Sequence, residues 1–160
     1  MDQYHRDQHF ESHQAAGCDL LIQLTPFQIN YAVIDQRDQS VQILSRFDYP
    51  TSHNAEDIIE RLDVLAQTRT ELNLLFAKTK ISVQSQTYTF IPTALFDSSL
   101  VGDYAKFMQT PSHQRQPLIV HELAAMDIQN VSIIRESLQE GLEARFNNLL
   151  VVNQASPLLM

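Results

Sequence analysis

Apolar and polar residues alternate along the first third of the chain, after a polar start. Three runs, at residues 19–25, 27–34 and 41–47, have the two-residue period that is typical of strands. The polar stretch at residues 35–39 separates the second run from the third and suits a hairpin turn. The pattern therefore predicts an antiparallel meander of three strands.

Helical spacing replaces the strand period after Pro50. Ile58, Leu62 and Leu65 form an apolar stripe at i, i+4 and i+7, which predicts a helix that follows the meander. We expect the turn at Ser85 and Gln86 to make either a hairpin or a bent strand. Further strands are predicted at 80–84, 87–91, 118–123, 129–134 and 149–152, a short helix at 98–108, a loop at 109–117 and a helix at 135–146.

This order of elements resembles the ribonuclease-H-like fold. The fold class predicted is α/β, with a mixed sheet of about five to seven strands and roughly two to four helices. Residues 1–17 carry few apolar side chains, and we expect them to be a flexible N-terminal tail before a domain at residues 18–160. A hydrophobic content of 44% and a charged content of 19% fit a globular chain of 160 residues.

Charge and cysteine content exclude several classes of function. The chain has 11 lysines and arginines against 19 acidic residues, for a net charge of -8, so binding to nucleic acid or to an anionic membrane is not expected. The N-terminus has no apolar segment of the signal-peptide kind, and no run approaches the length of a membrane span. With Cys18 as its lone cysteine, the chain is expected to be cytoplasmic.

Residues that could carry chemistry each have a simpler interpretation. His5, His9 and His13 would share one face of a helix and could hold a metal, but they also suit a solvated tail. Cys18 could be a nucleophile, yet a small buried residue at the start of a strand explains it better. The acids near strand ends could hold the metals of a nuclease, although turn and cap positions account for each of them; these acids are Asp19, Asp35, Asp48 and Asp127. No metal and no cofactor is expected.

A family resemblance rests mainly on residues 87–97, Thr-Tyr-Thr-Phe-Ile-Pro-Thr-Ala-Leu-Phe-Asp, followed by Asp103, Tyr104 and Phe107. This segment resembles the hallmark of an uncharacterised bacterial family, a domain of unknown function placed in the actin-like ATPase superfamily. The resemblance covers roughly Cys18 to Met160. It implies that residues 18–160 are the first half of an actin-like protein with two halves, which binds nucleotide between them.

The sequence departs from that superfamily at the first turn. Actin-like ATPases place an acid and a glycine-rich hairpin there, whereas residues 22–27 contain neither, and Pro26 lacks a backbone donor. We therefore predict a non-enzymatic interaction or scaffold module without the phosphate-binding loop, and lean against an enzyme. The alternative is a nucleotide-binding half that needs a second half or a partner chain.

A cluster of aromatic and apolar residues is the candidate interaction surface, although packing within the core would explain it as well. A protein partner or self-association is expected at this surface, because aromatic residues dominate interface hot spots. The residues that form it are Phe90, Pro92, Phe96, Tyr104, Phe107, Leu158 and Leu159.

Overall fold

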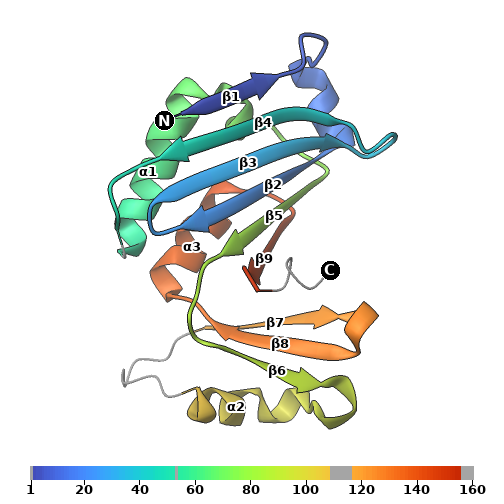
Figure 1. The fold of residues 1–160 in the computed structure, drawn as a ribbon, viewed down its shortest axis with the longest axis vertical. Helices are drawn as coiled ribbons and strands as arrows, with labels where there is room; N and C mark the ends of the chain where they lie inside the picture. The colour runs from blue at the N-terminus through green and yellow to red at the C-terminus, as the bar shows by residue number, and fades with distance from the viewer. Residues whose placement is uncertain (1, 53, 109–116, 156–160) are drawn as a thin grey trace.

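The computed structural model describes residues 2–52, 54–108 and 117–155, which form a large sheet and a small sheet (Figure 1). The large sheet has six strands in the order β1-β4-β3-β2-β5-β9. Their bounds are Gln3–Arg6 for β1, Cys18–Thr25 for β2, Gln28–Asp35 for β3, Val41–Asp48 for β4, Lys78–Val83 for β5 and Leu149–Asn153 for β9.

The predicted meander is confirmed. Strand β2 pairs with β3, and β3 with β4, in antiparallel register. Strand β5 then pairs with β2 in parallel, and β9 pairs with β5 in parallel. The crossovers use helices α1 (Ala55–Thr68) and α3 (Glu136–Arg145), which both lie behind the large sheet in the view of Figure 1. The large sheet is therefore mixed and has its helices on one face.

The small sheet is an excursion of the chain between β5 and α3. It has the order β6-β8-β7, and all its pairs are antiparallel. Because β5 and β6 belong to different sheets, residues 84–87 bend the chain from one sheet to the other and do not form a hairpin. The bounds are Tyr88–Pro92 for β6, Val101–Phe107 for helix α2, Leu118–Leu123 for β7 and Ile128–Ile133 for β8.

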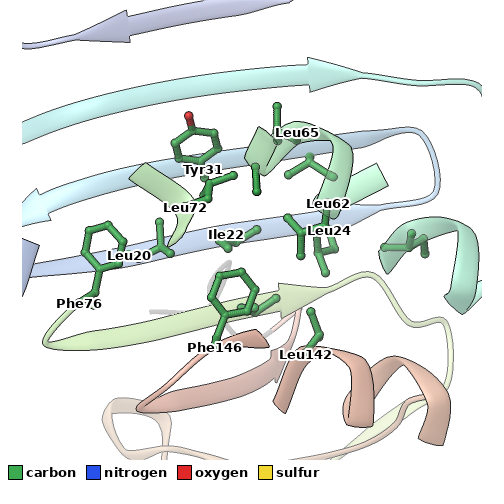
Figure 2. Close-up of a cluster of buried hydrophobic side chains, with 14 of the residues drawn as sticks. Leu20, Ile22, Leu24, Tyr31, Leu62, Leu65, Leu72, Phe76, Leu142 and Phe146 are labelled. Carbon is green, nitrogen blue, oxygen red and sulfur yellow. The ribbon is translucent and has the colours of Figure 1, made fainter. Parts of the chain in front are cut away.

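The principal core lies between the large sheet and its two helices (Figure 2). Alternation on β2 turns Leu20, Ile22 and Leu24 toward the helices, and each is 3% exposed or less. The stripe predicted on α1 supplies Leu62, and α3 supplies Leu142; both are fully buried. Apolar residues of the strands and of the two helices thus pack together in one buried layer.

The N-terminal segment is part of this large unit and is not a separate tail. Strand β1 pairs with β4, and Phe10 is 3% exposed within the core. The hydroxyl of Tyr4 donates to the carboxylate of Glu71 at 3.0 Å, and the guanidinium of Arg69 lies 3.9 Å from the centre of the Tyr4 ring. The expectation of a flexible tail is wrong for these residues, because backbone pairing and a few long side chains anchor a segment with little apolar content.

Candidate functional site

A pocket of about 280 Å³ lies where the two sheets join, and we call it the edge pocket. Its walls come from the carboxyl ends of β2 and β5, from the amino ends of α1 and α3, and from the two segments that connect the sheets. In open α/β sheets, ligands bind in the crevice outside the carboxyl ends of the strands. The lining residues are Leu24, Thr25, Pro26, Ser52, Ala55, Ile58, Val83, Gln84, Ser85, Gln86, Thr87, Ile133, Ile134, Arg135 and Leu138.

The hydroxyl groups of the edge pocket already hold its walls together. The hydroxyl of Thr25 donates to the carbonyl of Gln28 at 3.2 Å and so closes the turn between β2 and β3. The hydroxyl of Ser85 donates to the carbonyl of Ile133 at 2.8 Å, which joins the two connecting segments. The hydroxyls of Thr25 and Ser85 therefore have structural roles, because both donate to backbone carbonyls and neither donates to a carboxylate or an imidazole.

Ser52 organises the amino end of α1 at the rim of the edge pocket. Its backbone N–H donates to the carbonyl of Pro26 at 2.7 Å, and its hydroxyl donates to the carboxylate of Asp57 at 2.7 Å. The helix itself is capped by Asn54, whose side chain accepts from the N–H of Glu56. The amino end of α1 is thus satisfied by residues of its own segment.

The charge of the edge pocket is set by Arg135. This exposed residue precedes α3, and no carboxylate and no glycine stands among the lining residues that the structure describes. A lining of this kind can attract an anion, but it supplies no ligand of the type that magnesium prefers. Across residues 2–52, 54–108 and 117–155, no group of three or more His, Cys, Asp or Glu side chains is placed to hold a metal ion.

The predicted interaction surface splits into two aromatic pairs. Phe90 is 37% exposed on β6 and packs edge-to-face on Tyr88, with ring centres 5.4 Å apart. Phe96 stacks on Tyr104 at 5.8 Å, and the Tyr104 hydroxyl accepts from the backbone N–H of Asp97. Pro92 is exposed at the end of β6.

The other predicted surface residues are not placed. The side chain of Phe107 and the whole of Leu158 and Leu159 lie outside the described residues. The described members of the predicted surface thus lie in two places, with one aromatic pair on the edge of the small sheet and another that includes Tyr104 of α2.

Cys18 and the N-terminal histidines, which were considered for catalysis or metal binding, occupy positions that are explained by the fold. Cys18 is 1% exposed, and burial raises the pKa of its thiol, as expected for a small core residue. His5 lies on β1 and His13 lies in a short 3-10 helix beside Glu11, so the three histidines do not share one helical face. None of the described helices is long and apolar enough to cross a membrane.

The four candidate acids are turn and edge residues. Asp35 accepts from the backbone and the guanidinium of Arg37, which lowers the pKa of its carboxyl to about 2. Asp48 accepts from Gln28 at 2.8 Å. Asp127 has a φ of 54° in the turn before β8. Together with Asp19, these acids do not form a cluster that could bind two metal ions.

Sequence reasoning identified one wall of the edge pocket and missed the others. The sequence pointed to the turn at Thr25 and Pro26, because actin-like ATPases place their phosphate-binding loop at this turn. Ser85 and Arg135 were not assigned to a common site, since 50 positions of sequence separate them and no local motif links them. The bend after β5 and the start of α3 were the only signals that could have pointed to them.

Comparison with known proteins supports the fold and places the chain in a family. No curated protein matches it. A crystal structure of a Bacteroides thetaiotaomicron protein, described as having an actin-like ATPase fold and unknown function, superposes with a TM-score of 0.81 at 15% identity. The match covers 93% of this chain and 56% of that one, so the chain spans little more than half the length of that protein.

At 15% identity, this likeness shows the fold alone, and it confirms the predicted actin-like fold. A family model provides the more direct evidence, because it matches residues 7–160, nearly the whole chain. The chain belongs to the family described as "Protein of unknown function (DUF3822)".

Proposed function

We propose that this chain is a non-enzymatic interaction module, built on an actin-like fold without the phosphate-binding loop. The observation that carries the proposal is the lining of the edge pocket. The described lining has one charged residue, Arg135, and offers no carboxylate to position a magnesium ion or a water molecule. Hydrolysis of a nucleoside triphosphate needs one group that holds magnesium and another that positions the attacking water molecule.

The turn between β2 and β3 supports the same proposal. Its two residues are Pro26 and Phe27, so one of its two backbone donors is missing, and Phe27 is 49% exposed. A cradle for phosphate is built from successive backbone N–H groups, which glycines allow to approach the anion closely. This turn has neither feature.

Exposed aromatic residues are where protein contacts are expected. Phe90 and Tyr88 lie on β6, which is an edge strand of the small sheet, and they are 37% and 40% exposed. Aromatic side chains supply much of the binding free energy at interfaces. A partner protein or a second copy would use this edge.

Titration with ATP and magnesium, followed by calorimetry, tests the proposal. We expect no binding heat from the 160-residue chain. Micromolar binding that is lost in Arg135→Ala would overturn the proposal, since it would place a nucleotide in the edge pocket. Leu95→Ala is a matched control, because Leu95 is 73% exposed and lies outside that pocket.

The alternative function is a nucleotide-binding half that is completed by a second half or another chain. The observation in its favour is the position of the edge pocket, at the amino ends of α1 and α3 with Arg135 beside it, where an anion would be stabilised. Weak binding of ATP that does not need magnesium but does need Arg135 would favour this alternative.

A further inference from the structure

We propose that the face of the large sheet opposite α1 and α3 docks an amphipathic helix of another protein, with acidic residues flanking its apolar stripe. We call this surface the open face. The inference rests on the proposed interaction role and names a surface and a partner class for it. The open face is separate from the edge pocket and from the aromatic pairs of the small sheet.

Register across the six strands defines the open face. Cross-strand partners run in one row from β1 to β9, and all of them point away from the two helices. This row consists of His5, Leu44, Ala32, Leu21, Lys80 and Leu150. A hollow of about 390 Å³ lies over its centre and is lined by Leu21, Ala32 and Leu44 among others.

Four of the six residues in this row of the open face are apolar. Leu44 is 56% exposed and Leu150 is 44% exposed, and Figure 1 shows no helix over this side of the described sheet. Sheets that are wholly parallel are covered on both faces, whereas the parallel part of this mixed sheet, β2, β5 and β9, has helices on one face. On β2, Leu21 is apolar although it faces away from the core.

Charge indicates the chemistry of the partner. Lys80 lies between Leu21 and Leu150 in the row, and no carboxylate of the described residues lies within 4.0 Å of its ammonium group. The face thus presents an unpaired cation amid apolar residues, on a chain whose net charge is -8. A carboxylate on the partner would pair with Lys80 as the apolar residues are buried.

The net charge of the chain disfavours a second copy as the occupant. An isologous dimer would bring this face against itself, and each of the two copies carries a net charge of -8. Like charges at an interface cost binding free energy. We therefore commit to a different protein as the partner.

Dimensions set the length of the helix. Six strands that are about 4.8 Å apart span roughly 24 Å, which a helix crosses in about 16 residues at a rise of 1.5 Å per residue. A segment of that length with apolar residues at i, i+3, i+4 and i+7 offers a stripe that can cover Leu44, Ala32 and Leu21.

A displayed library of helical peptides of this length tests the inference. Apolar positions are fixed as leucine, and the remaining positions are randomised among glutamate, lysine, glutamine and alanine. Against the 160-residue chain, we expect selection of peptides with glutamate beside the leucine stripe. Binding should fall at least tenfold in Leu44→Glu and in Lys80→Glu, and it should be unchanged in Leu95→Glu, which puts the same charge on an exposed leucine elsewhere.

Several results would overturn the inference. These are the absence of any selected peptide, selection of lysine-flanked peptides, binding that Leu44→Glu leaves intact, or self-association in sedimentation experiments that Leu44→Glu abolishes. The variants must keep the circular dichroism spectrum and unfolding midpoint of the parent chain for the comparison to count. Failure here leaves the titration with ATP untouched, so it is distinguishable from failure of the proposed interaction role.

Discussion

Two neighbouring residues of β4 show how differently the two faces of the large sheet are used. Ile43 points toward the helices and is 0% exposed, whereas Leu44 points to the open face and is 56% exposed. The side chains have the same size and nearly the same hydrophobicity. Coverage by helices, and not the apolar content of the strand, therefore decides which face becomes the core.

The comparison also explains why the open face is informative. Burial of an aliphatic side chain contributes about 1.5–3 kcal/mol, and Ile43 receives that contribution while Leu44 receives only part of it. Single exposed leucines are common and need no explanation. Leu44 and Leu150, however, share one cross-strand row with Leu21 and Ala32. This row, with Lys80 unpaired among the described side chains, is what points to a partner.

The covered face should give the largest effect on stability. Ile43→Ala is expected to lower the free energy of unfolding by about 2–5 kcal/mol, because it leaves a cavity between β4 and the helices. Ile43→Val is the control and should cost about 0.5–1.5 kcal/mol. Unfolding in urea measures both, and a cost for Ile43→Ala below that of Ile43→Val would contradict the assignment of this face as the core.

A buried polar cluster on the covered side should give the next largest effect. Glu71 is 4% exposed and accepts from the hydroxyl of Tyr31 at 2.6 Å and from that of Tyr4 at 3.0 Å. Glu71→Leu leaves the buried hydroxyl of Tyr31 without its acceptor and should cost about 1–3 kcal/mol. Glu71→Gln keeps an acceptor oxygen and should cost less.

Hydrogen exchange separates the local part of that effect from the global part. Because Tyr4 ties β1 to Glu71, the amides of residues 3–6 should lose protection in Glu71→Leu more than those of β2. Equal loss in both strands would show that the cluster does not anchor the N-terminal strand.

Most elements of the large sheet could be predicted from sequence, because their hydrophobic period matches their geometry. Strand β1 could not, since its four residues are all exposed and it is held by backbone pairing and by Tyr4. The hydrophobic period of the strands also could not show which face of the sheet the helices would cover. The run Leu20-Leu21-Ile22 is apolar on both faces, and only the tertiary structure places α1 and α3 on one of them.

Gly141 shows the same limit for a helix. From sequence, a glycine within α3 only weakens the helix, by about 1 kcal/mol relative to alanine. In the structure, a Cβ at this position would lie 2.8 Å from Cγ1 of Ile59 on α1. The glycine therefore permits close packing of the two helices, which no local pattern could reveal. The edge pocket was only partly predictable for a similar reason, since its walls come from segments that meet only in the fold.

Acid should weaken the structure beside the open face before it affects the turns of the large sheet. His121 on β7 has a buried Nδ1 atom that finds no hydrogen-bond partner among the described residues, and burial, together with the charge of Lys80, lowers its pKa below the usual 6.5. The unfolded chain then binds a proton more readily than the folded one. The contribution of His121 to stability is thus fully present above about pH 6.5 and is lost as the pH falls through the folded pKa.

A proton NMR titration of His121 measures this effect. In Lys80→Gln the pKa should rise toward its ordinary value but should not reach it, because burial is the larger cause. Asp35 is the matched group at a turn of the large sheet. Its lowered pKa, about 2, means that its contribution is present above about pH 3.9 and is lost only as the pH falls toward 2. A pKa of His121 that does not respond to Lys80→Gln would contradict the charge effect.

The smallest effect is expected on the open face itself. Leu44→Ala should change the free energy of unfolding of the isolated chain by less than about 0.5 kcal/mol, because the side chain is more than half exposed and leaves no cavity. Unfolding in urea, run beside Ile43→Ala, measures the contrast between adjacent positions of one strand. A cost for Leu44→Ala that approaches the cost for Ile43→Ala would mean that something already covers the open face in solution. The same substitution should weaken binding of the selected acidic helix, so that Leu44 matters for partner contact and Ile43 for folding.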